Sequence, residues 1–157
     1  KKYFIDTAKY TFQLARREKT DLSLIILDID NFKKINDHCG HKAGDKVIKE
    51  LALKLQTLMR KSDILCRFGG EEFIVLLPGT GMKGAVTTAE KIRQATAKLL
   101  ISCEHKIPSG TDQEISLTIS AGVAQINLQQ DNKIDSIILR ADLALYEAKN
   151  SGKNTVC

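Results

Sequence analysis

No run of apolar residues in this sequence is long enough to cross a membrane. The longest aliphatic run, Leu24 to Leu27, is far shorter than the roughly 20 residues of a transmembrane helix. The chain opens with Lys1-Lys2-Tyr3-Phe4 and lacks the apolar core of a signal peptide. We therefore expect a cytoplasmic domain with no membrane span, although a longer protein that contained it could be anchored elsewhere.

Proline, glycine and cysteine are too few or too scattered to dominate the architecture. Two prolines and 10 glycines exclude collagen-like and proline-rich disordered material. The four cysteines form no Cys-x-x-Cys pair, so we expect reduced thiols and no disulfide framework. His38 and His41 flank Cys39, but the further ligands of a zinc site are missing.

The sequence is long enough for one domain, and its net charge is positive. A length of 157 residues suits a single domain with a sizeable core. The 24 Lys and Arg residues exceed the 19 Asp and Glu residues by five. This balance suits ligands that carry phosphate, but a solvated surface with a lysine excess explains it equally well.

Hydrophobic periodicity predicts alternating helices and strands. Helices are expected at residues 3–18, 41–59, 82–99 and 133–150, with a shorter one capped by Asp30 and ending near residue 38. Strands are expected at residues 22–30, 64–68, 72–77, 115–120 and 122–126, and a turn at 109–112. Val86 and Leu99 are expected on the inner face of the third long helix. This order predicts an α/β fold of the α+β sandwich type, with a mostly antiparallel central sheet, a split βαβ arrangement and surrounding helices.

Two adjacent acidic residues stand at the turn of the predicted hairpin, residues 64–77. A Gly-Gly turn requires nothing of Glu71 and Glu72, and acidic residues are an unusual start for an apolar strand. They could serve only to prevent the hairpin end from pairing with other chains. A functional role would require another carboxylate at the same end of the sheet.

Asp28 supplies such a carboxylate, because it lies at the carboxyl end of a predicted strand, where open sheets place their sites. Strand alternation puts Asp28 and Asp30 on one side and Ile29 on the other. An aspartate and a hairpin glutamate can together hold Mg²⁺, which favours a few carboxylates plus phosphate oxygens. Asp30 is explained as a helix N-cap, so we assign only Asp28 to a metal.

Residues 69–73, Gly-Gly-Glu-Glu-Phe, resemble the signature of the GGDEF family of diguanylate cyclases in its GGEEF form. Residues 28–37, 40–45, 116–123, 141–149 and 152–154 resemble further blocks of the family, in the same order. The resemblance covers essentially the whole chain and implies a ferredoxin-like, palm-like GGDEF fold. It also implies an enzyme dependent on Mg²⁺ or Mn²⁺ that condenses two GTP molecules into cyclic di-GMP and two pyrophosphates.

The family's motifs imply roles for residues at matching positions. Asp28 and Glu71 are implied to bind the metal, helped by the Ile29 carbonyl, and Glu72 to assist metal binding or proton transfer. The other implied positions are Asn36 and Asp45 for guanine, Lys33, Lys149 and Lys153 for phosphates, and Gly69, Gly70 and Phe73 for the active-site hairpin.

The implied guanine and phosphate residues agree with elementary chemistry. A carboxylate such as Asp45 can accept both N1–H and N2–H of guanine, donors that adenine does not offer in that arrangement, so we expect GTP to be preferred. Asn36 and Asp45 would each, alone, also be explained as helix caps. Lys153 departs from the family pattern, in which arginine is frequent at this position. The ammonium group of lysine carries the same charge but cannot form the two parallel hydrogen bonds that a guanidinium group forms with a phosphate.

Arg60-Lys-Ser-Asp63 resembles the family's inhibitory RxxD motif. Arginine can bond guanine O6 and N7, and aspartate can accept from the same base. A pair of residues in a surface loop would explain the pattern as well. Arg93 resembles a secondary arginine of some members, and we assign it to the same site, which predicts inhibition by the product.

The resemblance also bears on domains and partners. Only residues 1–4 resemble the tail of the family's opening block, so we expect residues 1–157 to form a single GGDEF domain without its N-terminal motif and upstream regulatory region. The two-fold symmetric product implies a homodimer for catalysis. A catalytically silent cyclic di-GMP receptor is an alternative, although such members usually have a broken hairpin signature. An RNA-binding module is disfavoured, because the three Tyr and five Phe form no row on a strand, and we expect no nucleic-acid partner.

Overall fold

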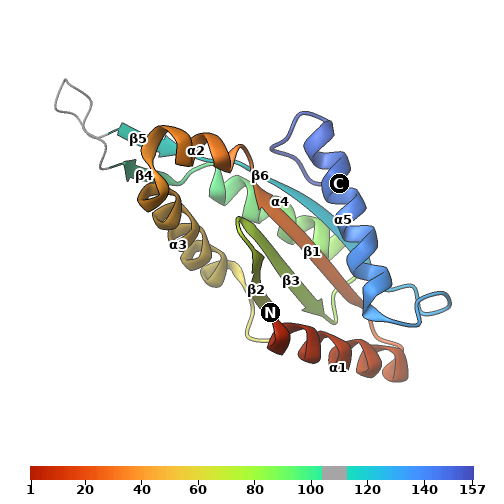
Figure 1. Ribbon diagram of the computed structural model, residues 1–157. Helices are drawn as coiled ribbons and strands as arrows, with labels where there is room; N and C mark the ends of the chain where they lie inside the picture. The colour runs from red at the N-terminus through yellow and green to blue at the C-terminus, as the bar shows by residue number, and fades with distance from the viewer. Residues whose placement is uncertain (104–112) are drawn as a thin grey trace.

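The computed structural model describes residues 1–103 and 113–157, which form five helices and six strands (Figure 1). In chain order these are α1 (Lys2–Glu18), β1 (Leu22–Ile29), α2 (Phe32–Cys39), α3 (His41–Leu58), β2 (Ile64–Gly69), β3 (Glu72–Pro78), α4 (Met82–Thr96), β4 (Leu100–Cys103), β5 (Gln113–Ser116), β6 (Ile119–Gln125) and α5 (Ile134–Asn150). None of the helices in these ranges is both long and apolar enough to span a bilayer.

The main sheet has four strands in the order β2-β3-β1-β6, and all neighbouring strands are antiparallel. β1 and β2 therefore run parallel to each other on either side of β3, which is the predicted split βαβ arrangement. The last residues of the chain lie along the outer edge of β6, where Ala121 N–H donates to Thr155 O at 3.0 Å and Cys157 N–H donates to Ala121 O at 3.0 Å. The predicted fold class is confirmed.

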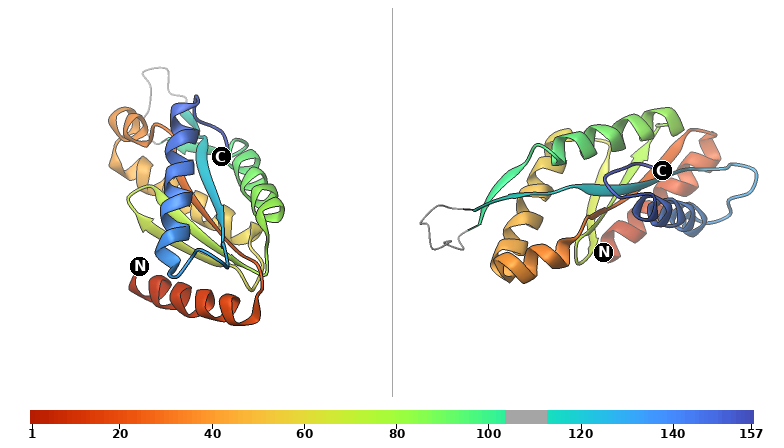
Figure 2. Two further views of the ribbon diagram at one scale, coloured as in Figure 1. Left: turned by 90° about the vertical axis from the view of Figure 1, so that its right-hand side faces the viewer. Right: turned by 90° about the horizontal axis from the view of Figure 1, so that it is seen from above.

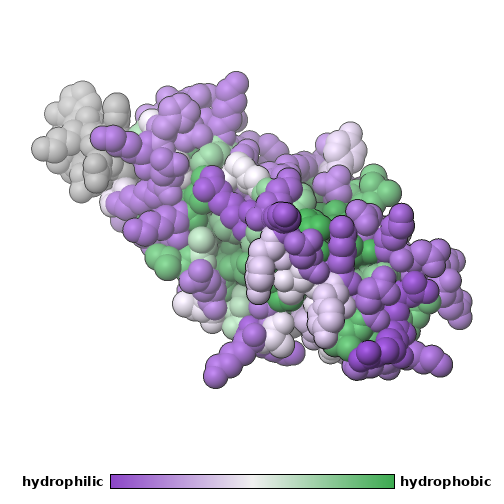
Figure 3. All heavy atoms as spheres, turned by 60° about the horizontal axis from the view of Figure 1, so that its bottom comes forward, coloured by the Kyte–Doolittle hydropathy of each residue, from purple (hydrophilic) through white to green (hydrophobic). Residues whose placement is uncertain are grey.

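Helices cover both faces of the main sheet (Figure 2). Ile25, Leu27 and Ile29 of β1 pack with α3 and α4, whereas Leu24 and Ile26 pack with α1 and α5. All eight residues of β1 are buried, and the residues from Leu24 to Leu27 are all apolar, as expected for a central strand with two covered faces. Outside the cores, hydrophilic side chains dominate the face shown in Figure 3, with smaller apolar areas between them.

The prediction of a single strand at residues 115–120 is wrong, because these residues belong to two different strands, β5 and β6. β5 ends at Ser116 and pairs with β4, an element that the periodicity did not predict. β6 begins at Ile119, pairs with β1 and ends at Gln125, so it covers all but the last residue of the expected strand at residues 122–126. Ile115, Leu117 and Ile119 are all buried, so the alternation continues through the break and conceals it. The expected turn at residues 109–112 lies outside the described residues.

Two further expectations about the helices are also wrong. The N-cap of α2 is Asn31, so Asp30 does not cap this helix; its carboxylate accepts hydrogen bonds from other parts of the chain instead. On α4, Val86 is 40% exposed and Leu99 lies beyond the end of the helix. The inner face of α4 carries small side chains such as Ala85 and Ala89, which let the helix approach the sheet closely.

An ion pair between a buried aspartate and a partly exposed arginine holds the end of the sheet that lies away from Asp28. Asp131, in the loop between β6 and α5, is 2% exposed. Arg140 of α5 donates from Nη1 and Nη2 to the two carboxylate oxygens, both at 2.7 Å, and Nη2 also donates to Gln125 O. The hydrogen bonds from Arg140 hold the pKa of Asp131 below its ordinary value. This pair connects α5 to the end of β6.

We predict that Asp131→Ala lowers the free energy of unfolding at pH 7 by about 1–2 kcal/mol, because Arg140 loses two charge-assisted hydrogen bonds while water can still solvate its partly exposed guanidinium. The pKa of Asp131 is lower in the folded protein, so the stabilisation is present above the ordinary pKa and is lost as pH falls through the depressed value. Urea unfolding at a series of pH values should show parent and variant converging below about pH 4. Equal stability at pH 7 would contradict the prediction.

Candidate functional site

Three carboxylates lie near the carboxyl end of β1. Asp28 pairs directly with Glu72 of β3, and Glu71 lies in the turn between β2 and β3. Residues opposite each other on antiparallel strands have Cβ atoms about 4.5–5.5 Å apart and share one face of the sheet. The negative charges of Glu71 and Glu72 both act on Asp28 and raise its pKa. The sequence prediction that Asp28 and the hairpin acids lie at one end of the sheet agrees with this arrangement.

Asp28 is the most buried of the three carboxylates, with a residue exposure of 7%. Burial is the largest effect on its pKa, which is raised overall. Lys149 of α5 opposes this effect, because its Nζ lies 3.0 Å from Asp28 Oδ2 and its charge favours the ionised carboxylate. The ammonium group of Lys149 therefore already contacts the carboxylate of Asp28, the side chain that the sequence analysis assigned to the metal.

The hairpin turn that carries Glu71 is stabilised by a hydrogen bond on one side and by a buried aromatic residue on the other. Gly70 has a φ of 26°, in the region that glycine adopts most readily, and its carbonyl accepts a hydrogen bond from Arg67 Nε at 2.8 Å. After the turn, Phe73 is 1% exposed and pairs with Leu27 in the core. The register of β2 shifts between Arg67 and Gly69, which marks a β-bulge beside the turn. Arg67 gave no signal in the sequence, because an exposed charged residue on an outer strand is common.

Asn36 and Asp45 come from different helices that meet at a tight corner. Gly40, with a φ of 80°, joins α2 to α3. At Gly44, in the first turn of α3, a Cβ atom would overlap Asn36 Oδ1 and approach the Phe32 ring. The side chain of Asn36 therefore lies against the backbone of Gly44, directly beside Asp45. Sequence reasoning did not give Gly44 this role, although a glycine within a helical pattern is a signal of close approach.

The three implied phosphate-binding lysines lie on different elements. Lys149 contacts Asp28, as described above. Lys153 lies in the loop after α5, not on the helix, and its Nζ donates to Asn31 Oδ1 at 2.6 Å. Lys33 is exposed on the first turn of α2. Asn31 and Lys33 follow the end of β1 within four residues. Lys33 therefore lies near that strand end through the chain, and Lys153 lies near it through its hydrogen bond to Asn31.

Arg60 and Asp63 lie in the loop between α3 and β2. Arg60 N–H donates to Asp63 Oδ2 at 2.8 Å and Asp63 N–H donates to Arg60 O at 3.1 Å, which closes a compact turn. Beside it is a pocket of about 550 Å³, whose charged lining residues are Arg60, Lys61, Asp63 and Arg67. Neither Asp28 nor Glu71 lines this pocket. It is therefore separate from the carboxylate cluster, although Arg67 and Phe73 belong to the same hairpin.

Arg93 lies elsewhere, on α4. Its guanidinium donates to the carboxylate of Glu90 at 2.9 and 2.6 Å and to Asn154 Oδ1 at 2.8 Å. It does not line the pocket beside Arg60. Its assignment to an inhibitory site stays a prediction.

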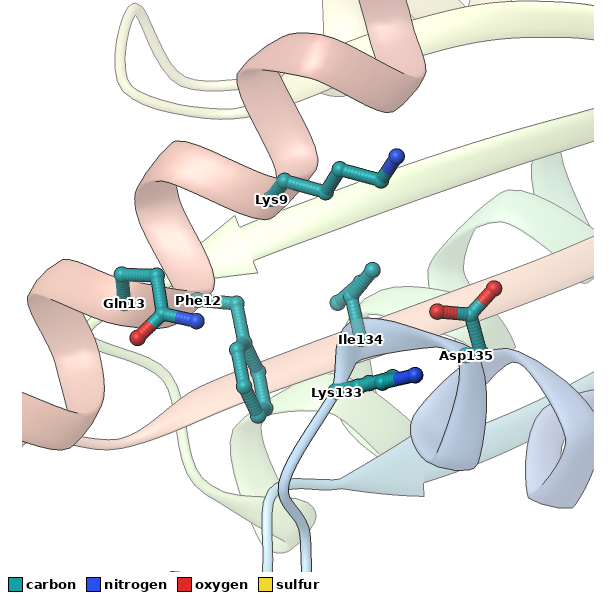
Figure 4. Close-up of a pocket in the computed structure, with 6 residues that line it drawn as sticks. All are labelled: Lys9, Phe12, Gln13, Lys133, Ile134 and Asp135. Atoms are coloured by element: carbon teal, nitrogen blue, oxygen red, sulfur yellow. The ribbon is translucent and has the colours of Figure 1, made fainter.

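Another pocket, of about 350 Å³, lies between α1 and the start of α5 (Figure 4). Its lining residues are Lys9, Phe12, Gln13, Lys133, Ile134 and Asp135. No residue that the sequence indicated for function lines it. The candidate residues lie elsewhere, around the end of β1, the hairpin, the corner between α2 and α3 and the loop before β2.

Comparison with known proteins agrees with this arrangement. Residues 1–155 match the family described as "Diguanylate cyclase, GGDEF domain". The chain is 41% identical to Diguanylate cyclase A of Treponema denticola over 147 residues, which cover 94% of this chain and 38% of that protein. It also resembles the active GGEEF domain of a diguanylate cyclase from Vibrio cholerae, with a TM-score of 0.88 and 35% identity, over 100% of this chain and 94% of the other.

A further structural relative is the GGDEF domain of DgcB from Caulobacter crescentus in complex with c-di-GMP. It has a TM-score of 0.88 and 33% identity, and the match covers 99% of this chain and 87% of that domain. An antiparallel sheet in ferredoxin-like order, with acidic residues on a hairpin turn, defines a palm-like α/β domain. The chain belongs to the GGDEF domain family of diguanylate cyclases. It spans 38% of the length of Diguanylate cyclase A and 20% of the length of Diguanylate cyclase DgcP from Pseudomonas aeruginosa.

If Asn36 and Asp45 bind guanine, as the family resemblance implies, Gly44→Ala should raise the KM for GTP by about 10-fold, because the added methyl group displaces Asn36 from its place beside Asp45. Steady-state turnover at varied GTP, with the melting temperature measured in parallel, checks this. Lys49→Gly, on the exposed side of the same helix and away from Asn36, controls for a general loss of stability. An unchanged KM in a folded Gly44→Ala protein would contradict the close approach.

Proposed function

We propose that this domain condenses two GTP molecules into cyclic di-GMP and releases two pyrophosphates. The observation that carries the proposal is that Asp28, Glu71 and Glu72 lie near one strand end, with Lys149 against Asp28. Family membership supports it, as do relatives named diguanylate cyclases at about 40% identity. Negative charge on one hairpin and positive charge on surrounding elements suit a ligand that carries both phosphate and a cation.

The carboxylates fit Mg²⁺ or Mn²⁺ as a cofactor. Asp28 and Glu71 would hold the ion, together with the backbone carbonyl of Ile29. No three His, Cys, Asp or Glu side chains within residues 1–103 and 113–157 converge as a complete metal site. Mg²⁺ matches such a partial site, because it usually binds one or two carboxylates and completes its shell with substrate phosphates and water. When bound, the metal would neutralise the triphosphate and stabilise in-line displacement at the α-phosphate.

The residues around the metal would bind and orient the nucleotide. Asp45 would accept from N1–H and N2–H of guanine, with Asn36 beside it, so that adenine would leave the carboxylate unpaired. The lysines would bind the phosphates: Lys149 by exchanging part of its contact with Asp28, and Lys33 and Lys153 from the other side of the strand end. Glu72, opposite Asp28, would assist the metal site or accept the proton of the attacking 3′-hydroxyl.

Catalysis would require two copies of the domain. One set of guanine and phosphate residues binds one GTP, and the product joins two identical nucleotides symmetrically. Two copies that face each other across a two-fold axis would present each 3′-hydroxyl to the other α-phosphate. Formation of this homodimer makes activity per subunit depend on protein concentration.

The pocket beside Arg60 and Asp63 would bind cyclic di-GMP as an inhibitor. Arg60, Lys61 and Arg67 surround it with positive charge, and Asp63 offers a carboxylate to a guanine edge. Because this pocket is separate from the carboxylate cluster, its occupation would inhibit without displacing GTP. The complex of the DgcB domain with c-di-GMP supports a domain of this fold as a receptor for that ligand.

Two other functions have less support. A catalytically silent receptor would not need the intact Gly-Gly-Glu-Glu-Phe turn or the burial of Asp28 between charged groups. An RNA-binding sheet requires an open strand face on which bases can stack, whereas helices cover both faces of the main sheet.

The decisive experiment is pyrophosphate release from GTP with Mg²⁺, measured at several protein concentrations and with ATP in place of GTP. We predict that the rate of GTP turnover per subunit rises with protein concentration, and that ATP is turned over little.

We also predict that Asp28→Asn lowers kcat by at least about 100-fold with the fold retained, because a neutral amide replaces a negatively charged ligand of the metal. Circular dichroism verifies folding, and Asp6→Asn on the exposed face of α1 is the matched control. Wild-type turnover by folded Asp28→Asn would exclude this residue from the metal site.

We predict that Arg60→Ala retains turnover but loses inhibition by cyclic di-GMP, with binding weakened about 100-fold. Isothermal titration of cyclic di-GMP and its inhibition constant check this. Lys54→Ala, on the preceding helix and outside the pocket, is the control for lost positive charge. Unchanged binding and inhibition in Arg60→Ala would mean that the RxxD sequence is an ordinary surface loop.

A further inference from the structure

The loop that follows α5, residues 151–154, has an unusual backbone. Lys153 and Asn154 have φ values of 65° and 48°, and Gly152 before them has a φ of 111°. Two successive non-glycine residues in the left-handed region are costly, and such conformations persist when surrounding contacts determine them. Lys153 N–H donates to Ala148 O at 3.2 Å, which closes the end of the helix. Other contacts must hold Asn154.

Asp30 provides the first of those contacts. It is 5% exposed, and its carboxylate accepts three hydrogen bonds. Ser120 Oγ donates to Oδ1 at 2.7 Å, while Thr118 Oγ1 donates to Oδ2 at 2.7 Å and Asn154 N–H donates to Oδ2 at 3.0 Å. A buried carboxylate needs such donors, because burial without them is very unfavourable. Asp30 thus joins β1, the start of β6 and the loop after α5.

Arg93 provides the second contact, from the opposite layer of helices. Its Nη1 donates to Asn154 Oδ1 at 2.8 Å. Glu90 orients the guanidinium through two further hydrogen bonds, and these bonds lower the pKa of Glu90 to about 2. Asn154 is therefore held through its backbone by Asp30 and through its side chain by Arg93.

We propose that Asp30 is a positioning residue: by holding Asn154 it places the neighbouring Lys153 for the phosphates of the substrate, and it is not itself a metal ligand. This inference rests on the proposed function. Lys153 Nζ lies 2.6 Å from Asn31 Oδ1, so its charge is already at the strand end that carries Asp28. All three hydrogen bonds to Asp30 come from protein donors. A loop held in advance does not have to be ordered when the nucleotide binds, so the effect should fall on KM and not on kcat.

The first test compares substitutions of Asp30. Asp30→Ala should raise the KM for GTP about 10-fold with kcat within about 3-fold, and should weaken a non-hydrolysable GTP analogue similarly in calorimetry. Asp30→Asn should restore KM to within about 3-fold of the parent, because its oxygen can accept from Asn154 and its NH₂ can donate to Ser120 Oγ. The Mg²⁺ concentration for half-maximal activity should be unchanged in Asp30→Asn.

The second test asks whether the effect passes through Lys153. In a Lys153→Ala background, Asp30→Ala should leave KM unchanged, because the group that it positions is already absent. Asp131→Ala is the matched control: it removes another buried carboxylate, at the far end of the sheet, and should lower stability without raising KM. If Asp30→Ala does not fold, Arg93→Ala should raise KM about 3-fold, again only when Lys153 is present.

The outcomes separate this inference from the function on which it rests. Absence of GTP turnover by the parent protein would overturn the proposed function. With an active parent, equal KM values for Asp30→Ala and Asp131→Ala would overturn the positioning role. Additive effects of Asp30→Ala and Lys153→Ala would also overturn it, and an increased Mg²⁺ requirement of Asp30→Asn would make Asp30 a metal ligand.

Discussion

Burial of β1 between two layers of helices is the constraint on which this domain depends. All eight residues of the strand are buried, so a shift of register by one residue would move apolar side chains between two different cores. The register with β3 and β6 is therefore determined strongly. Its consequence at the carboxyl end is that Asp28 lies opposite Glu72, on the face that α5 covers, where Lys149 can reach it.

Charges of opposite sign reach that strand end from different elements. The carboxylates come from β1 and the hairpin, whereas the lysines come from α2, α5 and the loop after α5. Burial and the neighbouring glutamates raise the pKa of Asp28, and Lys149 only partly offsets them. A site with excess negative charge at its centre and positive charge around it matches a metal bound to a triphosphate, because each component balances one part of the site. Asp30 takes no part in this balance, since protein donors occupy its oxygens.

Local sequence signals were reliable where one element determines its own conformation. The Gly69-Gly70 turn between two apolar runs predicted the hairpin, and the apolar stripe of α5 predicted that helix to within one residue at its start. They failed where a residue's role depends on a distant partner. Alternation runs unbroken through Leu117, so it could not reveal that β5 pairs with β4 and β6 with β1. Asp30 resembled an N-cap because the donors that it accepts from lie about 90 and 124 residues away.

From the sequence alone follow the five helices, the buried central strand, the hairpin and its acidic turn, because turn chemistry and hydrophobic period act over a few residues; β4 and the break between β5 and β6 do not follow from it. Family resemblance added the candidate roles of Asn36, Asp45 and the lysines, and family membership is now established. Only the tertiary structure decided which of these groups meet. It set Gly44 against Asn36, placed the guanidinium of Arg93 beside Glu90 and Asn154, and attached the loop of Lys153 to Asp30. These contacts join residues far apart in the chain, and packing of the two helical layers on the sheet brings them within hydrogen-bond distance.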